Sequence, residues 1–344
     1  MSRVVFLLSP TPLDSPRGNA VTVARIARGL RERDVDARVW HAPDAASAAA
    51  LETEAARTRP SLVHAFHARH TGTLGRILAE AAGVPLVLTL TGTDVSEDLR
   101  DDARGPLVRQ TLLAAAAVTA FHSSVVSELG AVARALGQRL AIVPQSVRFE
   151  PVGGDTPPPI SGEPCLLFPA GIRAVKRPTL PLAALDGLVG RRPATRLWYA
   201  GPVLDSEEHA RLLDGLATRP WARHLGAVPH AAMPALLAAA DIVLNCSRSE
   251  GGMANAVLEA LALGRAVLAS DIPGNRSLVE PGVTGLLWGS EAELAEGAAR
   301  LAADPALRRR LGAAGRQLVA EQFTPALEAE GYLTVYARVW AHER

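Results

Sequence analysis

Residues 242–271, I-V-L-N-C-S-R-S-E-G-G-M-A-N-A-V-L-E-A-L-A-L-G-R-A-V-L-A-S-D, contain the pattern that decides the fold. An apolar run (242–245) leads into a loop with two glycines, then into a segment of helical period, and then into a second apolar run (267–269). Two short apolar runs joined through a helix are typical of a βαβ unit, whose strands are parallel. This stretch therefore predicts part of an α/β domain.

The same alternation continues outward from this stretch in both directions. Apolar runs alternate with Ala/Leu/Arg segments of helical period, which predicts two doubly wound domains in tandem. The predicted strands are 4–8, 37–40, 62–66, 86–90, 118–121 and 141–143 in the first domain, and 166–168, 196–200, 224–226, 242–245, 267–269 and 285–287 in the second. Helices are predicted to begin near Asn19, Ala45, Thr71, Gly105 and Ser123.

The alternation breaks once, and this break predicts the domain boundary. Residues 151–164 have no periodicity and contain several prolines, which cannot join a helix interior or a strand ladder. The predicted organisation is therefore an N-terminal Rossmann-like domain (1–150), a linker (151–164), a C-terminal domain (165–324) and a last helix (325–344) that follows Phe323-Thr324-Pro325.

Composition and charge exclude several classes of protein. The 344 residues carry 36 basic and 35 acidic side chains, a net charge of +1, so no overall field attracts nucleic acid or an anionic membrane. The longest nearly apolar run, 112–121, is far below the roughly 20 residues that span a bilayer. The first apolar stretch is too short for a signal peptide, and Cys165 and Cys246 lie in apolar runs. We therefore expect a cytoplasmic protein.

The loop of the opening stretch has the features of an anion site. In doubly wound sheets ligands bind beyond the carboxyl ends of the strands. Gly251, Gly252, Met253 and Ala254 lie between such an end and a helix, so their backbone N–H groups could approach a diphosphate. Glu250 and Glu259 could accept hydrogen bonds from sugar or ribose hydroxyls. The alternative is that Glu250 is a helix N-terminal charge and Glu259 a solvated helix residue.

A second cationic motif follows the predicted strand at 166–168. In P-A-G-I-R-A-V-K-R-P, Lys176 is the only lysine of the chain. A single Lys in such an Arg-rich sequence favours a site that prefers a compact ammonium, and Arg173 and Lys176 are its candidate diphosphate ligands. A surface lysine without a function is the alternative.

The N-terminal half offers weaker signals. Gly18 and Asn19 could form a phosphate- or acceptor-binding turn, or Asn19 could cap an ordinary helix. His64, His67 and His70 straddle a strand end, and because we find no nearby Cys or carboxylate to complete a tetrahedral set, we expect no metal. His67 is the one expected to face the cleft, and His64 is expected to pack in the strand.

Residues 91–98, T-G-T-D-V-S-E-D, follow the predicted strand at 86–90. This stretch predicts either a helix-capping turn with Asp94 as the cap or part of a binding site that includes Thr93. The pair Asp34 and Asp36 could resemble a metal-binding D-x-D motif, but it lies between a helix end and a strand start, on the edge opposite the ligand loops, and is interpreted as a solvated turn.

Taken together, these motifs resemble the retaining family-4 glycosyltransferases of the GT-B fold. The motifs are G-N-A-V-T, F-H-A-R, T-G-T-D-V-S-E-D, G-I-R-A-V-K-R-P and S-E-G-G-M-A-N-A-V-L-E. The set is most similar to the glycosyltransferase 1 domain-containing proteins and their bacterial relatives, and also to the selenosugar synthases of selenoneine biosynthesis. Two departures are visible: eight residues separate Glu250 from Glu259 where the family has seven, and Thr91 stands where the family often has His.

The resemblance implies two facing Rossmann-like domains with the last helix crossing back to the N-terminal one. It implies retaining, metal-independent transfer of a sugar from a nucleotide-diphosphate sugar, with UDP-sugar favoured, to an acceptor held by the N-terminal domain. Glu250, His67 and Asp94 would be catalytic, Arg173 and Lys176 would bind the diphosphate, and Glu259 the ribose. A catalytically inactive nucleotide-sugar-binding protein and a GT-B sugar-nucleotide epimerase are the alternatives.

Overall fold

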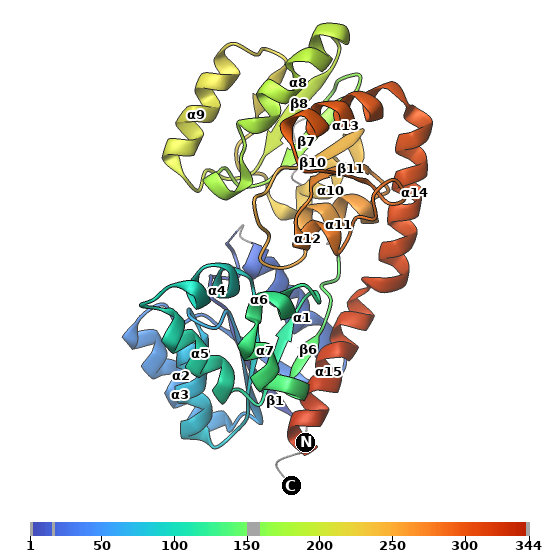
Figure 1. Ribbon diagram of the computed structural model, residues 1–344. Helices are drawn as coiled ribbons and strands as arrows, with labels where there is room; N and C mark the ends of the chain where they lie inside the picture. The colour runs from blue at the N-terminus through green and yellow to red at the C-terminus, as the bar shows by residue number, and fades with distance from the viewer. Residues whose placement is uncertain (1–2, 16–17, 150–158, 342–344) are drawn as a thin grey trace. The chain divides into compact units, whose positions relative to one another are not determined.

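A computed structural model describes residues 3–15, 18–149 and 159–341 of the chain. The chain divides into two compact units (Figure 1). Unit 1 consists of Met1–Ser146 and Phe323–Arg344, and unit 2 of Val147–Gln322. Each unit is an α/β layer structure built on its own six-stranded sheet.

The sheet of unit 1 is parallel throughout, in the order β2-β1-β3-β4-β5-β6. Its strands are β1 (Val4–Leu8), β2 (Asp36–Trp40), β3 (Leu62–Phe66), β4 (Leu86–Thr89), β5 (Ala117–Ala120) and β6 (Leu140–Ile142). Its helices are α1 (Gly18–Arg31), α2 (Ala45–Thr58), α3 (Gly72–Ala82), α4 (Thr93–Ser96), α5 (Gly105–Ala114), α6 (Val125–Leu129), α7 (Ala131–Leu136) and α15 (Pro325–Ala341). This order reverses direction between β1 and β3, which is the flavodoxin-like switch point.

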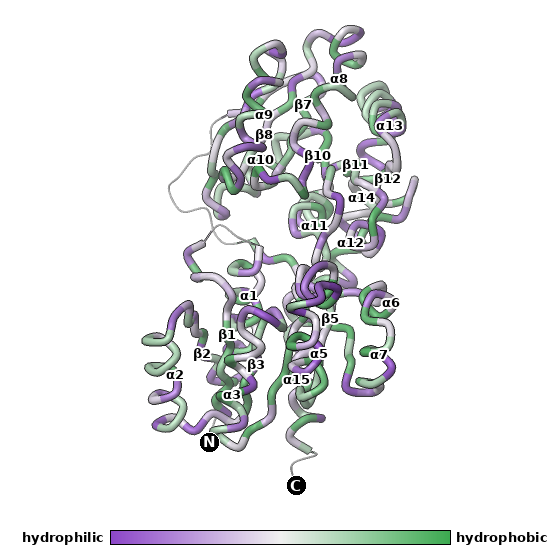
Figure 2. Tube along the Cα trace, turned by 60° about the vertical axis from the view of Figure 1, so that its left-hand side comes forward, coloured by the Kyte–Doolittle hydropathy of each residue, from purple (hydrophilic) through white to green (hydrophobic). Residues whose placement is uncertain are grey.

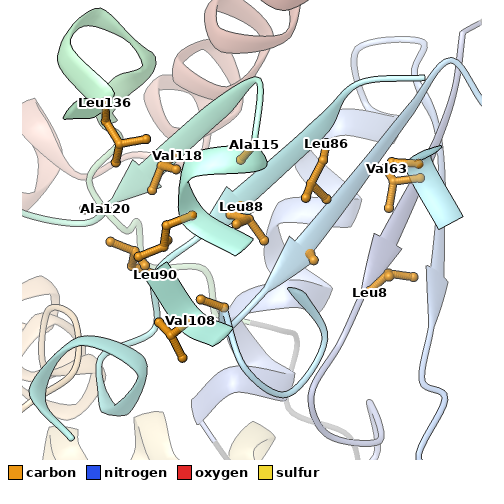
Figure 3. Packing of buried hydrophobic residues seen from close by; sticks show 14 of the residues in the cluster. Leu8, Val63, Leu86, Leu88, Leu90, Val108, Ala115, Val118, Ala120 and Leu136 are labelled. Atoms are coloured by element: carbon orange, nitrogen blue, oxygen red, sulfur yellow. The ribbon is translucent and has the colours of Figure 1, made fainter. Parts of the chain in front are cut away.

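Helices cover both faces of this sheet, because successive strand residues point to opposite sides. Phe6 and Leu8 of β1 pack with residues of α2, α3, α5 and α7, whereas Val5 and Leu7 pack with residues of α1 and α15. Figure 3 shows the first of these clusters, in which Leu86, Leu88 and Leu90 line up along one strand and its continuation. Figure 2 shows hydrophobic colour along central strands and mixed colour along helices such as α2.

The last helix belongs to unit 1 because buried polar contacts attach it there. Arg25 of α1 forms a two-point ion pair with Glu328 of α15, both bonds being 2.8 Å long. Tyr336 OH lies 2.6 Å from Nδ1 of His64 on β3. A buried ion pair that lost one partner would leave an uncompensated charge, so these contacts fix where α15 packs. The predicted return of the last helix to the N-terminal domain is confirmed.

Unit 2 has a parallel sheet in the order β12-β11-β10-β7-β8-β9. Its strands are β7 (Cys165–Pro169), β8 (Arg196–Ala200), β9 (Ala222–His224), β10 (Ile242–Asn245), β11 (Ala266–Ser270) and β12 (Leu286–Trp288). Its helices are α8 (Leu180–Arg191), α9 (Ser206–Ala217), α10 (Met233–Ala239), α11 (Asn255–Ala262), α12 (Pro273–Arg276), α13 (Glu291–Ala303) and α14 (Pro305–Gln322). This is the Rossmann order, with the switch point between β7 and β10.

All twelve predicted strands exist, so the α/β prediction of two doubly wound domains is confirmed. The largest shift is at β9, which ends at His224 rather than at Gly226. Gly226 has φ of +79°, a conformation that does not continue a strand. Residues 151–158 of the predicted linker (151–164) lie outside the described residues, and its described part, 159–164, belongs to unit 2. None of the helices in the described ranges combines the length and the apolar character needed to cross a bilayer.

Candidate active site

The loops after β7 and β10 bring together two oppositely charged side chains at the switch point of unit 2. Lys176 ends the short 3-10 helix Ala174–Lys176 after β7, and Glu250 lies in the loop after β10. Lys176 Nζ lies 2.5 Å from Glu250 Oε1, with 14% and 12% of the two side chains exposed. Two predicted site residues therefore form a largely buried ion pair at the edge of the sheet where doubly wound domains bind ligands.

Glu250 is held through one carboxylate oxygen. Oε1 also accepts hydrogen bonds from Asn245 Nδ2 (3.0 Å) and Ser247 Oγ (2.6 Å). Among the residues that the structure describes, none forms a hydrogen bond with Oε2. Burial acts to raise the pKa of this carboxyl, but the charge of Lys176 and the three hydrogen bonds outweigh burial and hold the pKa below its usual value. Glu250 is therefore ionised at neutral pH, with one oxygen able to accept a hydroxyl.

Residues after β11, to which the sequence analysis assigned no role, fix the geometry of this loop. Asn275 donates to the side-chain oxygen of Asn245 at 3.1 Å. A Cβ on Gly274 would lie 2.6 Å from the carbonyl oxygen of Gly252 and 2.8 Å from Cβ of Glu250. Only glycine fits at 274, so the stretch S-D-I-P-G-N positions the acidic loop. Their place after a neighbouring strand was the signal that could have found them.

Two arginines flank Lys176 and behave differently. Arg177 is half-buried and binds the neighbouring loop. Its Nε donates to the carbonyl oxygen of Cys246 at 2.7 Å and its Nη2 to that of Ser247 at 3.3 Å. Arg173, the predicted diphosphate ligand, is exposed and has no side-chain hydrogen bond or ion pair with any described residue. Arg177 therefore ties the two loops together, and Arg173 is the guanidinium that is available to a ligand.

The predicted diphosphate loop connects Glu250 to α11. Gly251 and Gly252 are half-buried, whereas Met253 and Ala254 are buried. Ala254 precedes the first residue of α11 and forms no side-chain cap, because its side chain has no acceptor. The backbone N–H groups at the N-terminus of a helix are donors that an anion can meet, so the start of α11 is a candidate position for a diphosphate.

Glu259 lies in the second turn of α11 and is 9% exposed. Its Oε1 lies 2.9 Å from Nε2 of His230, which begins the 3-10 helix His230–Ala232. The interpretation of Glu259 as a solvated residue is therefore wrong, because packing around α11 buries the side chain. His230 was not recognised as a site residue: 29 positions separate it from Glu259, and only the fold brings them together.

In unit 1, His67 follows β3 at the β1/β3 switch point. It is 1% exposed and has φ of +81°, a strained conformation for a residue other than glycine. Its Nδ1 accepts the N–H groups of Arg69 and His70, both at 3.2 Å. The proton of the neutral ring is therefore on Nε2, which lies 3.0 Å from Thr93 Oγ1 and donates to it.

Asp94 is fully buried beside His67, and both of its oxygens are occupied. They accept the backbone N–H groups of Gly92 (2.7 Å), Ala68 (3.0 Å) and Thr91 (3.2 Å). Asp94 therefore ties the loop after β4 to the loop after β3. It is not the predicted helix cap, because Gly92 occupies that position.

Gly18 and Asn19 are the first two residues of α1. Gly18 is exposed and Asn19 half-buried, and Pro16 and Arg17 before them lie outside the described residues. His64 is buried in β3 between Tyr336 and Thr89, which is the packed position expected for it.

The argument that no carboxylate lies near the histidines is wrong. Asp98, from the loop after β4, lies within 4.8 Å of donor atoms on His67 and His70. The fold brings it there from 31 residues beyond His67. However, Asp98 Oδ1 binds Arg104 at 2.6 Å and lies 3.6 Å from Arg69. Two guanidiniums this close already neutralise the carboxylate and would repel a metal ion.

Part of unit 2 is similar to a known protein family. Residues 163–304 match the family described as Glycosyl transferases group 1. Glycosyltransferase 1 domain-containing protein 1 from Xenopus tropicalis is 26% identical over 263 residues, which cover 73% of this chain and 76% of that protein. The fold is that of the GT-B glycosyltransferases, and within unit 2 residues 163–304 are similar to a group 1 glycosyl transferase domain.

Two solved structures have the same fold. Sucrose-phosphate synthase from Thermosynechococcus elongatus has a TM-score of 0.81 at 18% identity, covering 99% of this chain and 100% of that one. Anabaena HepE in complex with UDP and glucose has a TM-score of 0.79 at 16% identity, covering 98% and 100%. The similarity to selenosugar synthases stays a prediction from the motifs.

Proposed function

We propose that this protein is a retaining glycosyltransferase that transfers a sugar from a UDP-sugar to an acceptor without a metal ion. The observation that carries the proposal is the pair of Lys176 and Glu250 at the switch point of unit 2. A diphosphate needs a cation and N–H donors, and a sugar needs a carboxylate that accepts its hydroxyls. Both kinds of group lie within one loop system there, and both the UDP complex of HepE and the motif resemblance support uridine as the base.

Each residue has a defined task in this reaction. When the bond between the sugar and the diphosphate breaks, negative charge develops on the diphosphate oxygen that leaves. Lys176, Arg173 and the N–H groups at the start of α11 offset that charge, which is the task a metal ion performs elsewhere. Glu250 accepts a hydrogen bond from a sugar hydroxyl through Oε2, and Glu259 accepts one from a ribose hydroxyl. Arg177 and Gly274 hold the loops and do not touch the ligand.

Unit 1 supplies the acceptor side in this proposal. His67 lies at the switch point of unit 1, where open α/β sheets bind ligands. Asp94 acts there by fixing the loops rather than by touching substrate. The unpaired, buried thiols of Cys165 and Cys246 support a reducing, cytoplasmic setting for the reaction.

A nucleotide-sugar panel tests the proposal directly. We expect one donor to raise the unfolding temperature and to release nucleoside diphosphate slowly to water, in the presence of EDTA. A ligand at 100 times its Kd stabilises by about 2.7 kcal/mol, which a thermal shift measures readily. No stabilisation by any nucleotide sugar would refute the proposal.

The eight-residue spacing between Glu250 and Glu259 favours one alternative, a nucleotide-sugar-binding protein without transfer activity. The same panel separates the two. Binding with no release of nucleoside diphosphate, either to water or to a panel of hydroxyl acceptors, would favour the binding protein.

A further inference from the structure

The contact between His230 and Glu259 lies away from the diphosphate end of the site. Nε2 of His230 is 2.9 Å from Oε1 of Glu259, and 36% and 12% of the two side chains are exposed. An imidazole N–H donates to a carboxylate, so this bond needs its proton on Nε2. Among the described residues none forms a hydrogen bond with Oε2 of Glu259. One oxygen is held and the other is left to accept.

The backbone on both sides of this contact is well fixed. Val257, Leu258, Ala260 and Leu261 of α11 are all at most 1% exposed, so the helix that carries Glu259 is wedged into the core of unit 2. His230 stands just before α10, which packs beside α11 (Figure 1). The glutamate side chain itself has three rotatable bonds, and ordering such a side chain costs conformational entropy. The hydrogen bond with His230 orders the side chain of Glu259 before a ligand binds.

We infer that His230 is a positioning residue that orients Glu259 to read the ribose hydroxyls, so that the protein selects ribonucleotides over 2′-deoxyribonucleotides. The inference rests on the proposed function, because it takes the ligand of Glu259 to be a nucleotide. His230 touches no ligand itself. It acts by keeping Oε1 occupied, which turns Oε2 toward one fixed direction. A ligand that lacks the hydroxyl gains nothing from that preorganisation.

The test compares the affinities of nucleoside diphosphates with and without the 2′-hydroxyl by calorimetry. The probe is whichever of UDP, GDP or ADP binds the wild type, together with its 2′-deoxy form. In the wild type we expect the ribonucleotide to bind roughly tenfold more tightly, since a hydrogen bond to a charged group is at stake. In His230→Ala we expect the ribonucleotide affinity to fall about three- to tenfold and the deoxyribonucleotide affinity to change little.

Two variants make this readout specific to positioning. His230→Gln keeps an N–H donor at the reach of Nε2 and should restore most of the discrimination, whereas His230→Asn is too short and should not. In a Glu259→Ala background, adding His230→Ala should cost nothing further, because the two residues act as one unit. Thermal unfolding of each variant checks that the fold is intact.

The outcomes separate the two hypotheses. If wild-type protein binds none of the three nucleoside diphosphates, the proposed function fails. If it binds one and distinguishes the 2′-deoxy form, but His230→Ala leaves that discrimination unchanged, the inference about His230 alone is overturned. Additive losses in the double variant would overturn it as well.

Discussion

Glu250 in unit 2 and Asp94 in unit 1 are both buried carboxylates that follow a strand of a parallel sheet, yet they are held in opposite ways. Glu250 is bound by a lysine and two polar side chains, all through Oε1. Asp94 is bound by three backbone N–H groups that occupy both of its oxygens. A carboxylate with an unoccupied oxygen can take a ligand, whereas one fully occupied by backbone holds the chain in place.

The same contrast extends to the rest of each site. Unit 2 offers charge: Lys176, the exposed Arg173 and the acidic pair Glu250 and Glu259. Unit 1 offers at its switch point the ring of His67 on a strained backbone, with Asp98 and its arginine partners beside it. The proposed function assigns the breaking of the donor bond to the loops of unit 2 and the binding of the acceptor to those of unit 1.

The largest effect is expected at Glu250. Glu250→Gln should lower turnover roughly 100-fold or more, because it removes a charge that stabilises the transition state. The affinity for free nucleoside diphosphate should change little, since Glu250 meets the transferred sugar. Turnover is measured as nucleoside diphosphate release from the donor, and affinity by calorimetry.

Glu296→Gln, an exposed glutamate of α13, is the matched control and should leave both quantities unchanged. Equal losses of nucleotide affinity and turnover in Glu250→Gln would show that Glu250 reads the nucleotide instead. In that case the contrast between a catalytic Glu250 and a structural Asp94 would fail.

At Asp94 the expected effect is on folding. Asp94→Ala should destabilise unit 1 by about 2–4 kcal/mol, because it leaves buried backbone donors without a partner. The free energy of unfolding and the hydrogen exchange of the amides of Ala68 and Gly92 measure this loss. Asp102→Asn, an exposed residue of the same loop region, is the control. Full stability combined with lost turnover would make Asp94 catalytic and would remove the contrast.

Lys176→Ala tests how much the positive charge of Lys176 contributes to binding of the nucleoside diphosphate. We expect nucleoside diphosphate affinity to fall roughly 10- to 30-fold, the value of a hydrogen bond between charged groups. Because this variant also strips Glu250 of its cation, the double variant Lys176→Ala/Glu250→Gln separates the lost phosphate contact from that penalty. Affinity should be the same with and without EDTA. Dependence on a divalent ion would break the proposal that Lys176 performs the role of a metal.

The sequence predicted the parts of the site that depend on strand ends. Lys176 and Glu250 lie 74 residues apart, but both follow apolar runs of one parallel sheet, so the topology rule placed them together correctly. It could not order the strands, and the two units turn out to have different orders. A pattern of apolar runs predicts that a strand exists, but it does not predict which strands lie next to it in the sheet.

Contacts between residues far apart in the chain could not be predicted from the sequence. His230 reaches Glu259, and Asp98 reaches His67, only through tertiary packing. Asp94 shows a different limit: a short polar turn fits a cap and a binding loop equally well, and only the three N–H groups around the carboxylate decide. The sequence indicated which residues could take part in binding, but it did not indicate which side chains or backbone groups they contact in the fold.

The smallest effect concerns the buried ring of His64 in unit 1. Burial of the ring between Tyr336 and Thr89 disfavours its charged form and lowers the pKa of His64 to about 3. The unfolded chain binds the proton near pH 6.5 and the folded one does not, so stability is complete above that value and falls as pH drops toward 3. Between pH 7 and pH 5.5 this linkage should remove about 1 kcal/mol from the free energy of unfolding of unit 1. Chemical denaturation at the two pH values, with His64→Gln as the variant that cannot titrate, measures the difference. The two carboxylates with strongly lowered pKa, Glu54 and Asp101 at about 2, titrate below this window and do not confuse the result. An equal pH dependence in wild type and His64→Gln would mean that His64 accepts a proton in the folded state, and that its position between β3 and α15 does not exclude charge.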